Sequence, residues 1–224
     1  MKIIFRTLIC LLLFLVVTDS NAQSDLGLEQ KKILLIPFSR FEFHTELKLS
    51  WINGINQMEK DQYYPALKQA FGDGFVFGDF KKIKYALISD ADYTSIIPYI
   101  KFAVVSKEGH YASDLELLHQ NIYQKILEDY DCDFVLIFNW YRILERKESV
   151  KNKGARKFGV YTEHLIDYDF YDNKKHRLSY GANKKFMVVP TVENLQYGGV
   201  RISELRSVYK KLAVDITKEI SPSN

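Results

Sequence analysis

The chain has 224 residues, of which 47% are hydrophobic and 26% are charged. This balance is typical of globular proteins and excludes a chain that is disordered throughout. The formal net charge of +3 is too small to indicate binding to nucleic acid or to an anionic membrane, so we expect a folded protein with no nucleic-acid partner.

The amino terminus carries the three-part pattern of a secretory signal. Lys2 and Arg6 make the start positive, an apolar run follows over residues 8–17, and the small residues Ser20 and Ala22 precede a cleavage point. The run is shorter than the roughly 20 residues that span a bilayer. We expect residues 1–22 to be a cleaved signal peptide, which leaves a periplasmic or secreted protein with no transmembrane segment. An uncleaved anchor is the alternative.

The two cysteines give little scope for covalent chemistry. Cys10 lies early in the apolar run, with too little hydrophobic sequence before it for a lipid attachment site. Cys132 is then the only cysteine of the mature chain, so no internal disulfide can form. Because it directly precedes an apolar strand, a buried and inert thiol is favoured over a nucleophile.

The first part of the mature chain alternates apolar runs with loops. After a flexible, polar lead-in at 23–32, the continuous apolar run over 33–38 predicts a central strand covered on both faces. Residues 39–50, rich in Phe and charge, predict a loop. A strand is expected over 83–88 and another over 99–105, and residues 90–99 stay ambiguous between helix and strand.

Two helices are predicted before the next long strand. Apolar residues at helical spacing indicate a helix over 51–71, in which Pro65 begins a new helix or kinks the old one, and Gly72-Asp73-Gly74 ends it. A second helix is predicted over 113–130, with Ser113 as its cap. The strand predicted over 134–143 follows this helix, and that order suggests a crossover onto a parallel strand.

The last part of the chain predicts a hairpin and a closing helix. Alternating residues over 160–171 and 176–189 indicate two antiparallel strands joined by a turn at 172–175. These elements are flanked by a charged loop at 145–157, a loop at 190–200, an amphipathic helix over 202–220 and a tail at 221–224. The whole predicts an α/β fold with a mixed β-sheet and packed helices, a single-domain sandwich over residues 33–220.

Candidate chemistry is confined to the predicted hairpin. Asp167 and Asp169 lie on one face of a strand, near Asp172, and the favoured interpretation is a solvated face. A Ca²⁺ site or an acid/base pair are the alternatives. His164 and His176 lie on opposite arms and could approach each other as two metal ligands. No catalytic, cofactor-binding or metal-binding residue is assigned, and no cofactor is expected.

Three segments resemble a group of bacterial envelope proteins. They are the apolar strand at 31–38 (KKILLIPF), the segment at 131–138 (DCDFVLIF) after a helix, and the segment at 165–169 (LIDYD) before a turn. With an exported start and a long final helix, the chain resembles the TolB amino-terminal domain and the CsgG/LpoB-like periplasmic α/β proteins, as found among uncharacterised secreted Bacteroidetes proteins. Asn173-Lys174 stands where that group has a turn glycine, and no lipobox is evident.

This resemblance implies a non-enzymatic module that docks other envelope proteins, over roughly residues 31–220, and it implies no catalytic residue. We therefore expect an exported adaptor or protein-binding module that docks through the loops at 41–44 and 146–157. The alternatives are a small-ligand-binding protein that uses Tyr and Trp side chains, and an exported hydrolase or metal-dependent enzyme. The enzyme would require Asp167 and Asp169 to converge with a histidine in a concave pocket.

Overall fold

A mixed sheet forms the centre of the molecule. The computed structural model describes residues 31–78, 80, 82–152, 155–188 and 199–220. The strand order is β3 (Ile83–Leu87), β1 (Lys31–Ile36), β6 (Phe134–Asn152), β7 (Ala155–Tyr171) and β8 (Arg177–Val188), and β2 (Phe43–Thr45) pairs with β6 beyond β1. β1 is parallel to β3 and β6, whereas β6, β7 and β8 are antiparallel. The predicted mixed α/β sheet and the parallel crossover are confirmed.

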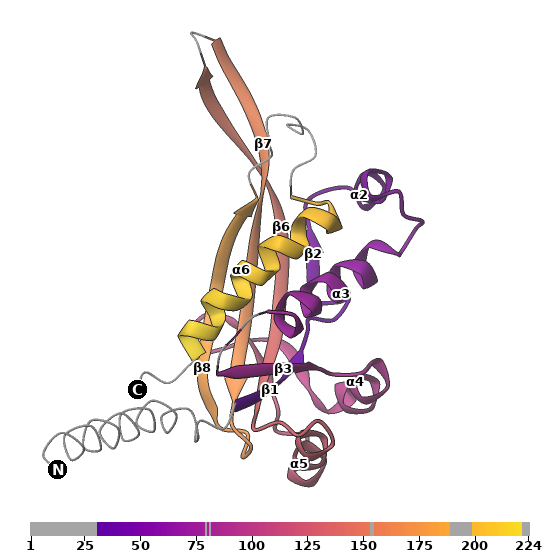
Figure 1. Cartoon of the computed structure of the whole chain (residues 1–224), viewed down its shortest axis with the longest axis vertical. Helices are drawn as coiled ribbons and strands as arrows, with labels where there is room; N and C mark the ends of the chain where they lie inside the picture. The colour runs from indigo at the N-terminus through magenta and orange to yellow at the C-terminus, as the bar shows by residue number, and fades with distance from the viewer. Residues whose placement is uncertain (1–30, 79, 81, 153–154, 189–198, 221–224) are drawn as a thin grey trace, which may run out of the picture. The chain divides into compact units, whose positions relative to one another are not determined.

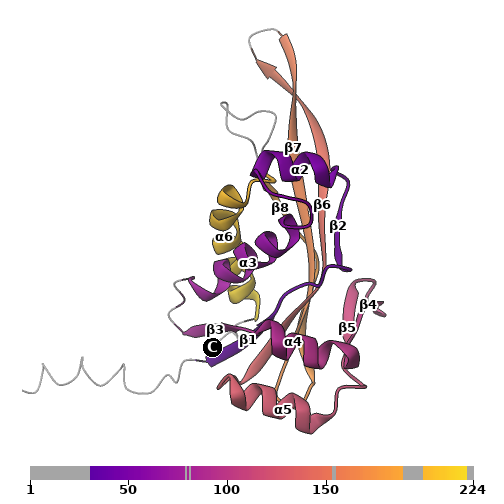
Figure 2. The same cartoon turned by 90° about the vertical axis from the view of Figure 1, so that its right-hand side faces the viewer.

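Alternating side chains of the central strands fill two separate cores. Ile33 and Leu35 of β1 enter one cluster, and Leu34 and Ile36 enter the other. This burial on both faces explains why β1 is a continuous apolar run. One face is covered by α2 (Leu49–Asn56), α3 (Tyr63–Val76) and α6 (Ile202–Ile220); the other is covered by α4 (Asp90–Ile96), the 3₁₀ turn η1 (Ile97–Tyr99) and α5 (Gln120–Asp129) (Figures 1 and 2).

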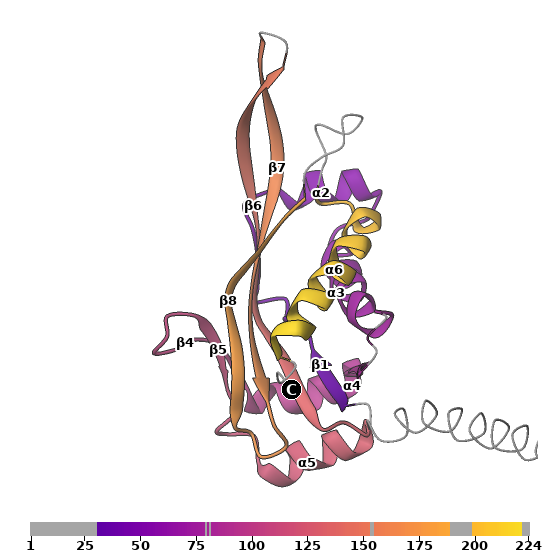
Figure 3. The same cartoon turned by 60° about the vertical axis from the view of Figure 1, so that its left-hand side comes forward.

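A small hairpin shares the second face with α4 and α5. It consists of β4 (Lys101–Val105) and β5 (Tyr111–Asp114), and Figure 3 shows it beside the sheet. The helix predicted over 113–130 is therefore wrong in its first part, because Ser113 belongs to β5 and α5 begins only after His119. Leu115 and Leu118 precede α5 but still enter the second core, so the apolar stripe was a true signal of burial.

The helix predicted over 51–71 is two helices. α2 ends where Gln57 adopts a left-handed backbone (φ 54°), and Pro65 lies in the first turn of α3, as predicted. Gly72-Asp73-Gly74 does not end α3, which continues to Val76. A Cβ on Gly74 would lie 2.6 Å from the Cβ of Tyr209, so this glycine permits close packing against α6 instead of a turn.

Two predicted loops contain strands. The loop at 39–50 contains β2, and the charged segment at 145–157 mostly continues β6 and β7, which pair as far as Asn152 and Ala155. The β7–β8 hairpin and the final helix over 202–220 are confirmed. The signal peptide, residues 23–30 of the lead-in, residues 190–198 of the last predicted loop and the tail lie outside the described residues. Lys31 and Lys32, predicted to belong to the flexible lead-in, are the first residues of β1. Among the helices that the structure describes, none is long and apolar enough to cross a membrane.

Candidate functional site

Asp169 is fully buried, with an exposed fraction of 0%, so the prediction of a solvated face is wrong. Its Oδ2 accepts hydrogen bonds from the backbone N–H of Ser113 at 2.9 Å and from Asn139 Nδ2 at 2.7 Å. Arg177 of β8 lies 3.6 Å from Oδ1. The carboxylate therefore fastens β5 to the sheet through a backbone donor.

Asp167, two residues before Asp169 on β7, has the same role. It is 1% exposed and accepts hydrogen bonds from the backbone N–H of Tyr111 at 3.0 Å and of Asn183 at 2.5 Å. Asn183 lies at an irregularity of the β7–β8 ladder with a left-handed backbone (φ 48°). Because the β4–β5 hairpin covers this face, both carboxylates are held by backbone donors away from solvent.

A histidine does contact one of these carboxylates, that of Asp169. His110 Nε2 donates to Asp169 Oδ1 at 3.1 Å, while its Nδ1 is 2.7 Å from Ser106 Oγ. The three side chains have the composition of a catalytic triad, but His110 and Asp169 are both at 0% side-chain exposure. Ser106 Oγ also accepts the backbone N–H of Glu108 at 3.2 Å in the β4–β5 turn. The enzyme alternative required Asp167 and Asp169 to converge with a histidine in a concave pocket, whereas His110 contacts Asp169 alone and the two side chains are fully buried.

His164 and His176 do not meet. His164 is paired with Phe186 on β8, whereas His176 lies in the turn that precedes Arg177. His164 is completely buried, and its Nδ1 is 2.6 Å from the hydroxyl of Tyr141. Burial lowers the pKa of His164 to about 3, so the ring is neutral. The predicted two-histidine site is wrong.

Asp172 and Cys132, the remaining candidates, have local roles. Asp172 Oδ1 accepts the backbone N–H groups of Lys174 and His176, both at 2.8 Å, and so orders the β7–β8 turn in the absence of the usual glycine. Burial raises the pKa of the Cys132 thiol to about 11, which keeps it protonated at neutral pH. The described residues contain no cluster of three or more His, Cys, Asp or Glu side chains able to hold a metal ion.

A groove runs between the edge strand β8 and α6. Its volume is about 860 Å³, and its apolar floor and cationic rim come from both elements. Lys184 is paired with Glu219 at 2.6 Å, and Lys185 is paired with Glu163 of β7. The lining residues are Lys184, Lys185, Phe186, Met187, Ser207, Val208, Lys211, Leu212, Asp215, Ile216, Lys218 and Glu219.

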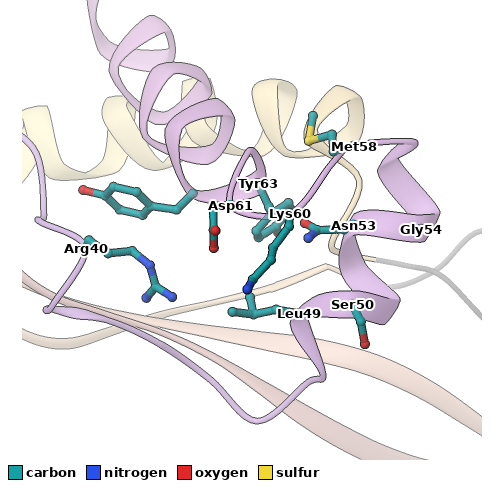
Figure 4. A pocket seen from close by; sticks show the side chains of 10 residues that line it. Arg40, Leu49, Ser50, Asn53, Gly54, Met58, Lys60, Asp61 and Tyr63 are labelled. Carbon is teal, nitrogen blue, oxygen red and sulfur yellow. The ribbon is translucent and has the colours of Figure 1, made fainter.

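A second cavity lies between the β1–β2 loop, α2 and the start of α3, with a volume of about 520 Å³ (Figure 4). Arg40, Lys60 and Asp61 line it together with apolar and aromatic side chains. Sequence reasoning missed both the groove and this cavity. Lys184-Lys185 within an otherwise alternating strand was an available signal for the groove, and the charged connection Lys60-Asp61 between two helices was one for the cavity.

Comparisons with known proteins yield only distant structural likenesses. No family model matches the chain, and no curated protein matches it. It is similar to the hypothetical protein CT253 from Chlamydia trachomatis (7% identity, 87% of this chain and 99% of that chain, TM-score 0.39). It is also similar to a neuraminyllactose-binding hemagglutinin homolog from Helicobacter pylori (11%, 88% and 86%, TM-score 0.38) and to lipoprotein GNA1162 from Neisseria meningitidis (11%, 86% and 99%, TM-score 0.28). None of the three is named as TolB or CsgG, so that resemblance stays a prediction.

Proposed function

We propose that the protein is a non-enzymatic binding module of the cell envelope that holds an extended, acidic segment of a partner protein along β8. The observation that carries this proposal is the open edge of the sheet next to a cationic groove. Among the described residues β8 pairs only with β7, and β8 is 12 residues long. An unpaired edge of this length presents backbone donors and acceptors to which another strand can add.

The side chains beside this edge favour a partner of defined chemistry. Phe186 of β8 faces α6, where its ring centroid lies 6.1 Å from that of Tyr209, and Val208 and Leu212 of α6 line the opposite wall of the groove. Four lysines and two carboxylates line the groove, which leaves it net positive. A segment that alternates acidic and apolar residues would complement both features, because successive side chains of a strand point to opposite faces.

Lysines on an edge strand also discourage self-association of sheets. Lys211 and Lys218, however, lie on α6 and not on the strand, so protection of the edge does not require them. If Lys211 and Lys218 contribute to peptide binding, the groove is a binding site and its lysines do more than prevent self-association of the sheet edge.

Other expectations for the function fare differently. Of the two loops predicted to dock a partner, the first supplies Phe41, which is 88% exposed, but Phe43 is 5% exposed and belongs to the core. The second, at 146–157, mostly forms the paired ends of β6 and β7. The signal pattern at residues 1–22 supports placement outside the cytoplasm, in the periplasm or secreted. The hydrolase alternative gains no support from the described residues, because Asp167 and Asp169 are buried and accept hydrogen bonds from the β4–β5 hairpin and from neighbouring strands.

A peptide-display selection tests the proposal. The mature protein is used to select from random peptides of about ten residues, the length that pairs with a strand such as β8. We expect enrichment of Asp and Glu at alternate positions, depletion of Pro, and protection of β8 amides from hydrogen exchange when a selected peptide binds. Selected peptides without acidic bias, or without protection of β8, would overturn the proposal.

Charge-reversal variants of α6 provide a matched control. Lys211→Glu with Lys218→Glu removes two groove cations, and we expect at least about tenfold weaker binding of the selected peptides, since charge-assisted contacts contribute about 1.5–3 kcal/mol. Arg206→Glu with Lys210→Glu makes the same change in net charge at exposed positions of α6 outside the groove. Equal losses in both variants would show a general charge effect and contradict the groove.

A further inference from the structure

The cavity beside α2 carries side-chain chemistry that neither the fold nor the β8 groove uses. It has a volume of about 520 Å³, which is in the range of small-molecule sites. Its wall comes from three separate segments: the β1–β2 loop, α2, and the turn that leads into α3. The cavity is therefore formed by tertiary packing of three segments and is not a groove between neighbouring turns of one helix.

The inner wall of the cavity is apolar and aromatic. Tyr63 is 1% exposed, and Leu49, Met58 and Tyr64 lie partly buried around the same space. Tyr64 is held in place by a hydrogen bond from its hydroxyl to the carbonyl of Phe38 at 2.8 Å. This wall would accept an apolar side chain of a ligand, which gains about 25 cal/mol for each Å² that it removes from water.

The mouth of the cavity combines charges of both signs. Figure 4 shows the side chains of Arg40, Lys60 and Asp61 directed toward the same space. Within the described part of the chain, none of the three forms an ion pair with another side chain, although Arg40 lies over the Tyr64 ring at 5.9 Å. Two cations and one carboxylate that do not neutralise one another leave both a binding point for an anion and one for a cation.

Asn53 adds a buried acceptor to this set. Its Oδ1 atom is buried and has no hydrogen-bond partner among the described residues, and Asn53 lines the cavity next to Lys60 in Figure 4. A buried carbonyl without a donor costs about 1–3 kcal/mol, which a ligand that donates a hydrogen bond would recover. A ligand that fits this site would therefore supply a hydrogen-bond donor to Asn53 Oδ1 and an anionic group to Arg40.

We propose that this cavity binds a free α-amino acid with an apolar side chain. The α-carboxylate would be held by Arg40 and Lys60, the α-ammonium would be held by Asp61 and Asn53 Oδ1, and the side chain would lie against the tyrosine wall. A zwitterion uses the donors and the acceptors together, whereas a plain carboxylate leaves Asp61 and Asn53 unpaired. The site is independent of the β8 groove.

Three probes that share one side chain test the assignment by calorimetry. L-phenylalanine carries both charged groups, 3-phenylpropionate lacks the ammonium group, and 2-phenylethylamine lacks the carboxylate. We expect L-phenylalanine to bind and each of the other two to bind at least about tenfold more weakly, with L-leucine and L-methionine tested alongside. If L-phenylalanine, L-leucine and L-methionine all fail to bind at about 10 mM, the proposal is overturned. Binding of 3-phenylpropionate that equals or exceeds that of L-phenylalanine would overturn it as well.

Variants of exposed residues then assign the two charged groups. Asp61→Asn is expected to weaken L-phenylalanine about tenfold and to leave 3-phenylpropionate unchanged, whereas Arg40→Gln is expected to weaken both. Lys48→Gln removes a charge from an exposed residue next to the cavity but outside its lining, and is expected to change neither. Loss of binding in Lys48→Gln, or the same response of both probes to Asp61→Asn, would contradict the assignment; unliganded melting curves confirm that each variant folds.

Discussion

Asp169 fastens a hairpin to the sheet by accepting hydrogen bonds that no neutral side chain could accept as well. Among the described residues, Oδ2 faces the backbone N–H of Ser113 and Asn139 Nδ2, and Oδ1 faces His110 Nε2 and the Arg177 guanidinium. In Asp169→Asn one oxygen becomes an NH₂ group that meets a donor. We expect a loss of about 2–4 kcal/mol in the free energy of unfolding, measured by urea denaturation. Asp215→Asn, at an exposed position of α6, is the control and should change it by less than about 0.5 kcal/mol.

We expect the protonation of His164 to make the free energy of unfolding depend on pH. Burial lowers its pKa to about 3, and its Nε2 lies 3.0 Å from the carbonyl of Gly199. In the unfolded chain the imidazole of His164 takes up a proton near pH 6.5, whereas in the folded protein it does so only near pH 3. The contribution of neutral His164 to the free energy of unfolding is therefore complete above pH 6.5 and is lost as the pH falls toward 3. Between pH 7.5 and 5 we expect this group to lower the free energy of unfolding by about 2 kcal/mol.

Histidine replacements isolate this contribution. His164→Gln keeps a donor and an acceptor but does not titrate, so the fall in stability below pH 7.5 should become shallower by about that amount. His44→Gln, at an exposed position of β2, is the control for replacing a histidine outside the core. An identical profile for wild type and His164→Gln in urea denaturation would show that His164 is not held neutral.

At the scale of elements, the short strand β2 is held by a single aromatic anchor. Phe43 packs against Phe38, Tyr63 and Tyr141, with ring centroids 5.9–6.3 Å apart. Phe43→Ala is expected to lower the free energy of unfolding by about 3–5 kcal/mol because it empties part of the core. Phe41→Ala, at an 88% exposed position two residues earlier, should change it by less than about 0.5 kcal/mol. Similar melting curves for the two variants would contradict the buried position of Phe43.

The far ends of β6 and β7 form a two-stranded arm, residues 144–152 and 155–161. β2 stops pairing with β6 at Ile143 and β8 stops pairing with β7 at Thr162, so beyond these positions each of the two strands has only the other as a partner among the residues that the structure describes (Figure 1). Replacing residues 148–159 by Asn-Gly would join the paired residues Lys147 and Val160 through a two-residue turn. Since no third strand pairs with the arm within the described ranges, we expect Tm to change by less than about 5 °C.

The same deletion separates the arm from the groove. Peptides selected on β8 should bind the shortened protein with unchanged affinity, because the groove uses β8 and α6 alone. A protein that no longer folds would show that the arm contributes to the core.

At the scale of the whole described unit, two cores share the same strands. Leu35 and Leu136 face one cluster, while Leu34 and Val135 face the other, so neither core can lose its packing without moving the backbone that carries the other. We expect a single cooperative unfolding transition. Two single-tryptophan variants test this expectation in one denaturant titration.

The tryptophans lie on different parts of the structure. Trp51 lies on α2 over the first core, and Trp140 stacks on Tyr111 of the β4–β5 hairpin at 4.6 Å. Trp51→Phe leaves Trp140 as the probe, and Trp140→Phe leaves Trp51. Within each variant the fluorescence midpoint should coincide with the circular dichroism midpoint; separate midpoints would show that the hairpin or α2 unfolds on its own.

Much of the architecture follows from local sequence. The unbroken apolar run of β1 predicted a strand buried on both faces, the alternating arms of β7 and β8 predicted their hairpin, and the stripe of α6 predicted that helix with its correct bounds. These signals are reliable because the 2-residue and 3.6-residue periods are properties of each element alone.

Whether a candidate residue is exposed depends on which elements pack against its face of the sheet. The periodicity of the sequence does not contain this information. The alternation of β7 correctly placed Asp167 and Asp169 on one side, but only the tertiary structure brings the β4–β5 hairpin over that side and makes them hydrogen-bond acceptors for its backbone. Ser113 was similarly a suitable helix cap by sequence and a strand residue in the fold. Local periodicity thus determined the elements and the two faces of the sheet, while contacts between residues distant in the chain decided burial, the groove beside β8 and the cavity beside α2, because solvent exposure depends on packing partners that the local sequence does not contain.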